Sequence, residues 1–181
     1  MRFAYWHPTP TGMPYSITPT TAAHFEGLYA AIDTVAREQR YLAFLQAPPR
    51  EQSFTFYRNI VANDLCQFVA LDGDEVVGWC DILPVMGDTR AHVGTLGIGL
   101  MPHARRKGIG TKLLQATIDK AWAKGLTRLE LTVRVDNPAK RLYERFGFEH
   151  EGLRRNAFLI EGEYFDTHAM ALLKPTTAKA G

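Results

Sequence analysis

Three consecutive basic residues precede two glycines in the middle of the chain, and this combination could bind an anion. Residues 105–110 read Arg-Arg-Lys-Gly-Ile-Gly. From Leu113 to Trp122 apolar residues recur at helical spacing, so the glycines stand where a helix begins. The first N–H groups of a helix have no partner within it, and glycines let a ligand approach them closely. The helix dipole and the basic side chains add positive charge, so a diphosphate group fits this turn.

Other phosphate-binding motifs fit these residues less well. A Walker loop needs Gly-Lys-Ser/Thr at its end, whereas here Lys107 comes before Gly108. A dinucleotide fingerprint would use Gly97 and Gly99, but Pro102 occupies the position of its third glycine. No pair of acidic residues follows the turn to hold Mg²⁺, which argues against a nucleotide phosphotransferase. A plain strand-to-helix turn with solvated charges remains the structural alternative.

A second motif lies about one helix and one strand further along the chain. Residues 142–148 read Leu-Tyr-Glu-Arg-Phe-Gly-Phe. They resemble the Leu-Tyr-x-x-x-Gly-Phe motif of the GNAT superfamily of acetyl-CoA-dependent N-acetyltransferases, and residues 105–110 resemble its Arg/Gln-x-x-Gly-x-Gly/Ala signature. The two motifs in this order are more specific than either alone. The resemblance covers Tyr15 to Leu173 and is strongest from Val76 onward.

The resemblance implies acetyl-CoA as co-substrate and direct acetyl transfer within a ternary complex. The diphosphate would lie on the backbone N–H groups of residues 106–111, and the pantetheine arm along the strand that ends at Leu100. Tyr143 would be the general acid, because a phenol of pKa near 10 is neutral at pH 7 and can protonate a leaving thiolate. Packing against the strand behind it is the alternative role for Tyr143. The predicted cofactor-binding residues are Ile98, Gly99, Leu100, Arg105, Arg106, Lys107, Gly108, Ile109, Gly110, Thr111 and Asn137, and no metal site is predicted.

Two positions depart from the pattern of the family. Its members commonly have asparagine seven residues before the tyrosine, where this chain has Asp136, with Asn137 one residue later. We favour Asn137 for that role, since Asn-Pro opens the helix and a carboxylate is unfavourable beside the cofactor. Many relatives also carry an acidic general base on the central strand, where this chain has Thr95. The amine could arrive neutral or lose its proton through water, so no base is assigned; the possible substitutes are Asp81, His92, Glu130, Asp166 and His168.

The elements that must position these residues predict a mixed α/β fold. Their order is β, α, α, β, β, β, α, β, α, β, β, which matches the GNAT fold: a mostly antiparallel seven-stranded sheet flanked by four helices. The resemblance further implies that the fourth and fifth strands splay apart to admit the pantetheine arm. Strands are predicted at 15–19, 66–71, 76–83, 91–100, 128–135, from 148, and at 156–160 and 164–173 in a hairpin. Helices are predicted at 25–36, 53–61, 112–124 and 136–147.

Composition limits the organisation of the chain and its partners. Its 181 residues, 46% hydrophobic and 22% charged, suit one globular domain at 14–173, with an irregular arm at 1–13 and a flexible tail at 174–181. A net charge of +2 is too small to indicate a nucleic-acid partner. No apolar run reaches membrane-spanning length or forms a signal-peptide core, so a cytoplasmic location is expected. Cys66 and Cys80 fall in apolar strands and are predicted to be buried free thiols.

The predicted function is N-acetylation of a primary amine, carried by an amino acid-like small molecule or by a protein N-terminus. The resemblance implies that the first two helices and the last hairpin build most of the acceptor site, and aromatic residues in these stretches would favour an apolar acceptor over a polyamine. Residues 156–170 look most like the branch of ribosomal-protein N-terminal and small-amine acetyltransferases. A non-catalytic acyl-CoA-binding module is the alternative, and assembly as a homodimer is left open.

Overall fold

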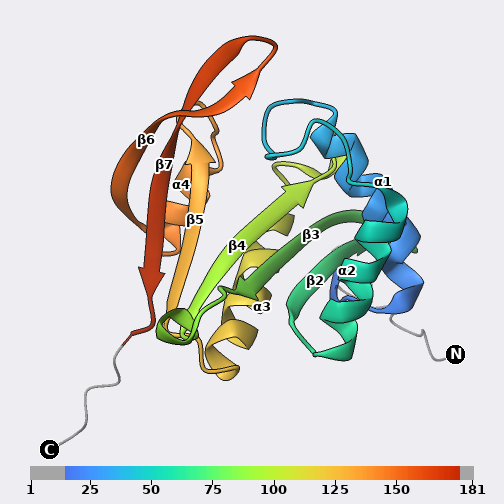
Figure 1. Ribbon diagram of the computed structural model, residues 1–181. Helices are drawn as coiled ribbons and strands as arrows, with labels where there is room; N and C mark the ends of the chain where they lie inside the picture. The colour runs from blue at the N-terminus through green and yellow to red at the C-terminus, as the bar shows by residue number, and fades with distance from the viewer. Residues whose placement is uncertain (1–14, 176–181) are drawn as a thin grey trace, which may run out of the picture.

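The computed structural model describes residues 15–175, so the arm predicted at residues 1–13 and residues 176–181 of the predicted tail lie outside the described residues. Seven strands form one sheet in the order β1-β2-β3-β4-β5-β7-β6 (Figure 1). The strands are β1 Tyr15–Pro19, β2 Cys66–Asp72, β3 Glu75–Pro84, β4 Val93–Leu100, β5 Arg128–Arg134, β6 Glu149–Ile160 and β7 Glu163–Leu173. All neighbouring pairs are antiparallel except β4 and β5, which are parallel.

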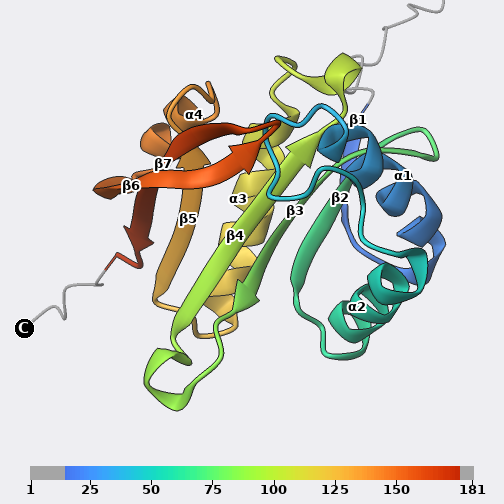
Figure 2. The ribbon, with the colours of Figure 1, turned by 45° about the horizontal axis from the view of Figure 1, so that its top comes forward.

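Four helices cover the two faces of this sheet (Figures 1 and 2). One apolar core joins α3 and α4 to one face, and a second core joins α1 and α2 to the other. The element order and the fold class predicted from the sequence are therefore confirmed. Within residues 15–175, no helix has the length and apolar character needed to cross a membrane. The helices are α1 Phe25–Ala36, α2 Arg50–Ala62, α3 Ile109–Ala123 and α4 Lys140–Arg145.

The splay implied for the fourth and fifth strands is present. Only residues 93–95 of β4 pair with β5, opposite residues 128–130. Beyond Thr95, β4 pairs with β3 alone as far as Leu100. Figure 1 shows the two strands close together at one end and widely separated at the other. The backbone of the second half of β4 therefore has a free edge toward β5.

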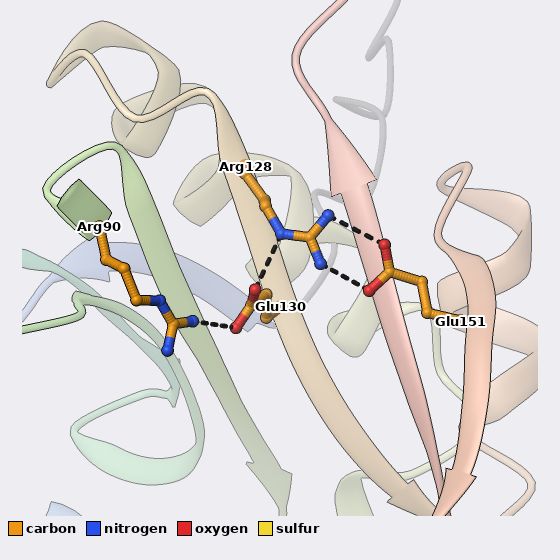
Figure 3. A network of polar contacts seen from close by, with 4 residues as sticks. All are labelled: Arg90, Arg128, Glu130 and Glu151. Carbon is orange, nitrogen blue, oxygen red and sulfur yellow. Dashed lines mark hydrogen bonds and ion pairs between the residues drawn. The ribbon is translucent and has the colours of Figure 1, made fainter.

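A network of ion pairs lies at the end of the sheet where β4 and β5 are paired (Figure 3). The Glu130 carboxylate on β5 accepts hydrogen bonds from Arg90, before β4, at 2.7 Å and from Arg128 at 2.8 Å. Arg128 also donates two hydrogen bonds to Glu151 on β6. Since these partners hold both of its oxygens, Glu130 has a structural role, and they lower the pKa of its carboxyl group.

The alternation of side chains along β4 separates the two cores. Leu96, Ile98 and Leu100 face the core with α3 and α4, so the residues between them face α1 and α2. On that face the Trp79 ring packs over Gly99, where an added Cβ atom would lie 2.2 Å from the ring. Cys66 and Cys80 are buried and free, as predicted from their apolar surroundings.

Several element boundaries differ from those predicted, and the structure gives a reason for two of the differences. Helix α2 begins at Arg50 rather than at residue 53, because Pro49 is its N-cap residue and ends the preceding loop. The predicted strands after residue 147 are one long strand, β6, whose pairing with β7 shifts register twice. At the second shift Asn156 adopts a left-handed conformation, and Asp166 accepts a hydrogen bond from its N–H.

Candidate active site

A cavity of about 530 Å³ opens where β4 and β5 separate. Its wall contains residues 95–100 of β4, residues 131–133 of β5, Tyr143 of α4 and residues 41–44 of the loop after α1. Its volume is typical of a site for a small molecule or cofactor. The cavity therefore joins the free edge of β4 to the two motifs that the sequence singled out.

The glycine turn has the unpaired amides that the sequence predicted. Among residues 15–175, no hydrogen-bond acceptor is in place for the N–H groups of residues 106–111, and Lys112 is the first residue to donate within the helix. Gly108, the N-cap residue of α3, has a left-handed φ of 76°. Arg106 has a φ of 62°, a conformation that costs a non-glycine residue about 1 kcal/mol. Strain of this kind clusters at functional sites.

The three basic residues of the turn have different surroundings. Arg105 forms an ion pair with Glu38 and donates a hydrogen bond to the carbonyl of Leu100 at 3.0 Å. Its guanidinium group therefore links the turn after α1 to the end of β4. Lys107 donates a hydrogen bond to the Tyr15 hydroxyl, a neutral partner that leaves the positive charge in place. Arg106 is exposed and forms no ion pair within the described residues.

Gly110 of the glycine turn lines the cavity between β4 and α4. A Cβ atom added there would lie 3.4 Å from Leu100 and 3.5 Å from Leu142. These are tight but ordinary contacts, so alanine fits while a large side chain would have to enter the cavity. Ile98, Gly99 and Leu100 also line the cavity, and their backbone lies at the free edge of β4. For Gly99 the structure supplies a packing reason, the Trp79 ring, beside the predicted approach of a ligand.

Tyr143 both packs and lines the cavity, so the two roles considered for it are compatible. Its side chain is 6% exposed, and its ring meets that of Phe148 edge to face at 6.0 Å between centroids. Burial raises the pKa of the Tyr143 phenol, and the nearby Cys80 thiol adds to this effect. The phenol is therefore neutral at physiological pH and retains a proton that it can donate.

Asp136 and Asn137 have different hydrogen-bond partners, and only Asn137 lines the cavity. Both Asp136 oxygens accept hydrogen bonds from Arg134, at 2.9 and 2.7 Å, and this pairing lowers the pKa of the Asp136 carboxyl group. Asn137 lines the cavity, and its side-chain oxygen accepts a hydrogen bond from the N–H of Ala139 at 2.9 Å. Asn137 is thus the residue of the two that adjoins the cavity.

Of the five possible substitutes for a general base, one borders the cavity. His92 is exposed, Glu130 belongs to the ion-pair network, and Asp166 accepts a hydrogen bond from the Asn156 N–H. His168 packs against the ring of His150. Asp81, on β3, lines the cavity. No local sequence pattern distinguished Asp81 from the others, because its neighbours at the cavity come from other strands.

Comparisons with known proteins agree with this arrangement. Residues 29–148 match the Acetyltransferase (GNAT) family. The L-amino acid N-acetyltransferase AaaT of Escherichia coli (strain K12) is 34% identical over 151 residues, which is 81% of this chain and 92% of that protein. The ribosomal protein bS18-alanine N-acetyltransferase of Salmonella typhimurium (strain LT2) is 37% identical over 76 residues, 41% of this chain and 51% of that protein.

Solved structures share the fold. The GNAT superfamily phosphinothricin acetyltransferase from Sinorhizobium meliloti, in complex with AcCoA, has a TM-score of 0.82 at 24% identity, over 92% of each chain. Similarity at this level of identity supports the fold, while the sequence matches establish the relationship. The chain therefore belongs to the GNAT family of acetyltransferases.

Proposed function

We propose that this protein transfers the acetyl group of acetyl-CoA to the primary amine of an amino acid-like molecule or of a protein N-terminus. The proposal rests on one observation: the free edge of β4, Gly110 of the glycine turn and Tyr143 all line the same cavity. A cofactor bound there would have its phosphates at the turn and its thioester near a buried phenol. Both substrates would be bound together, so that the acetyl group passes directly between them.

The cofactor would be held mainly by backbone atoms. The unpaired amides of residues 106–111 would bind the diphosphate, helped by the dipole of α3 and by Arg106 and Lys107. The pantetheine arm would hydrogen-bond to the free edge of β4 as an added strand does. Asn137 would supply an amide from the opposite wall. Arg105 would contribute indirectly, by fixing the end of β4 through its pair with Glu38.

The reaction is a nucleophilic substitution at the thioester carbonyl. The lone pair of the amine nitrogen attacks the carbonyl carbon, and the C–S bond breaks as the tetrahedral intermediate collapses. The phenol of Tyr143 gives its proton to the leaving sulfur and regains one from the nitrogen through water. A thiol of pKa near 8.5 leaves more easily as the neutral thiol than as the thiolate, so a buried neutral phenol suits this step.

The acceptor part of the cavity favours an apolar amine. Residues 41–44 of the loop after α1 and Phe158 of β6 border the cavity, and Figure 2 shows this loop reaching toward the β6–β7 hairpin. Tyr41, Leu42 and Phe44 supply apolar surface there. The names of the sequence relatives, an L-amino acid and a ribosomal-protein alanine acetyltransferase, agree with small or apolar acceptors.

A panel of amines tests this function. The protein is incubated with acetyl-CoA and, in separate reactions, with free amino acids, polyamines and short peptides, and the free thiol of coenzyme A is measured. We expect turnover with apolar amino acids or with peptides that have small N-terminal residues, and little with polyamines. Tight binding of acetyl-CoA without thiol release across the whole panel would contradict the proposal.

The exposed basic residues of the turn should contribute to cofactor affinity through charge. We expect the double variant Arg106→Ala/Lys107→Ala to bind acetyl-CoA about 10- to 100-fold more weakly, which corresponds to about 1.4–2.8 kcal/mol for the charge-assisted contacts of the two exposed side chains together. Its Kd, measured by calorimetry, should also depend less steeply on salt. Arg155→Ala, which removes an exposed charge on β6, is the control and should leave Kd unchanged. Equal affinity in the double variant and the wild type would contradict the assignment of the turn.

A further inference from the structure

Asp81 occupies the face of the sheet on which the acceptor part of the cavity lies. It is in the middle of β3, directly opposite Gly97 of β4. Gly97 is on the β4 face that points toward α1 and α2, as Thr95 and Gly99 are, and none of the three carries a carboxylate. Asp81 and Thr95 both line the cavity. An acidic group is therefore available at this face from the strand next to β4.

Gly97 makes room for the Asp81 carboxylate. A Cβ atom added at Gly97 would lie 3.0 Å from Asp81 Oδ1, which is closer than nearly all real Cβ contacts. Asp81 Oδ1 therefore lies over Gly97 of β4, whereas Oδ2 is turned toward Gln67 of β2. A methyl group at position 97 would shift the carboxylate by a few tenths of an ångström, and a larger side chain would displace it further.

The Asp81 carboxylate, which is half-buried in the cavity wall, has few protein partners. Among residues 15–175 it accepts one long hydrogen bond, from Gln67 Nε2 at 3.4 Å, and forms no ion pair. Arg105, the basic residue of the cavity wall, is already paired with Glu38. A carboxylate that only stabilised the fold would be expected to have several donors or a cation. The titratable groups whose charge is coupled to that of Asp81 are Tyr57 on α2 and Cys80 on β3, and Tyr41, Arg105 and Tyr143 line the same cavity.

We propose that Asp81 is the general base of the acetyl transfer, reaching the acceptor amine from β3 across Gly97. The inference rests on the proposed function of the same cavity. An Asp81 oxygen accepts a proton from the ammonium group of the acceptor, directly or through one water, and the freed lone pair attacks the thioester. The second proton of the nitrogen restores the phenol of Tyr143, and the proton on Asp81 returns to solvent. Acid and base thus lie on opposite faces of the sheet, Tyr143 in the core with α4 and Asp81 toward α1 and α2.

The protonation behaviour of Asp81 suits this task. Burial raises the pKa of its carboxyl group to about 7, and the hydrogen bond from Gln67 opposes the rise only in part. A base is most effective when its pKa lies near the working pH. A carboxyl of ordinary pKa, near 4, would be a much weaker base toward an ammonium group.

The test compares Asp81→Asn with wild type and with the exposed control Asp72→Asn on β2. We expect Asp81→Asn to lower kcat at pH 7 by about 10²- to 10⁴-fold, the usual contribution of a general base. The Kd for acetyl-CoA should stay within about threefold, and Asp81→Glu should recover part of the rate. In wild type kcat/KM should rise with pH and level off above about 7. In Asp81→Asn the rise of kcat/KM below pH 7 should be absent. Its kcat/KM should rise only at higher pH, where the amine loses its proton to solvent.

A second measurement reports on Asp81 without any substrate. Its pKa is raised from 3.8 to about 7 in the folded state, so its stabilising contribution is complete below about pH 4 and is lost as pH rises through 7. Urea unfolding should therefore show Asp81→Asn gaining stability relative to wild type between pH 5 and pH 8. Gly97→Ala should displace the carboxylate while leaving Asp81 present, and should lower kcat with little change in acetyl-CoA affinity.

The outcomes separate this inference from the proposed function. If wild type acetylates an amine while Asp81→Asn keeps its rate and pH profile, Asp81 is not the base and the proposed function stands. If wild type releases no thiol with any amine, both proposals fail together. Loss of rate in Asp81→Asn with an unchanged pH profile would make Asp81 a packing residue and would also overturn the inference.

Discussion

We expect Tyr143→Phe to lower kcat by about 10²- to 10⁴-fold while the Kd for acetyl-CoA stays within about threefold. The substitution removes only the hydroxyl group, so the ring keeps its edge-to-face contact with Phe148 and the fold should be maintained. Without the phenol, the sulfur must leave as a thiolate or take its proton from water. Steady-state assays of thiol release measure kcat, and calorimetry measures the Kd for acetyl-CoA separately.

Tyr57→Phe is a matched control for this experiment. Tyr57 is also buried, and burial raises the pKa of its phenol to about 12, but it belongs to the core of α1 and α2 and does not line the cavity. Removing its hydroxyl should change stability slightly and kcat hardly at all. If Tyr143→Phe loses affinity and turnover equally, or if the two variants behave alike, Tyr143 acts by packing.

The largest expected effect on binding is that of Gly110→Trp, which should weaken acetyl-CoA affinity at least 100-fold. Leu100 and Leu142 already lie at 3.4 and 3.5 Å from the position of an added Cβ atom. The indole ring can therefore extend only into the cavity or displace these side chains, and in either case it takes the space that the diphosphate and pantetheine would use. Binding is measured by calorimetry, and circular dichroism and thermal melting establish that the variant is folded.

Gly110→Ala provides the corresponding control. One methyl group makes ordinary contacts with Leu100 and Leu142, so the affinity should change by no more than a few-fold. A folded Gly110→Trp variant with wild-type affinity would show that the cofactor binds away from the turn. A variant that binds weakly because it is unfolded would be recognised by its melting curve, and Gly110→Leu would then replace it.

The local signals in the sequence were sufficient for the turn and the elements around it. The apolar repeat after residue 110 and the glycines before it identified α3 and its exposed N-terminus, because both features depend on neighbouring residues. The alternation of Leu96, Ile98 and Leu100 identified a buried strand for the same reason. The separation of β4 from β5 was predicted only from the resemblance to the family, because no residue pattern shows where two neighbouring strands stop pairing.

Contacts between distant residues account for what the sequence did not predict. Arg105 is predicted to bind the cofactor, and the structure adds an ion pair between its guanidinium group and Glu38, 67 residues earlier. Gly99 was expected to admit a ligand, and Trp79 on the neighbouring strand gives it a packing function as well. Asp81 could not be separated from four other candidates until the register of β3 against β4 placed it opposite Gly97. Each case depends on contacts between elements that are distant in the sequence, and the residue types alone do not specify these contacts.

The central claim is that the unpaired amides of the glycine turn bind the phosphates of coenzyme A. The most direct measurement is a crystal structure of the protein with coenzyme A bound. We predict diphosphate oxygens within hydrogen-bonding distance of the N–H groups at residues 108–111. Diphosphate density at any other part of the surface, with these amides left to solvent, would contradict the account.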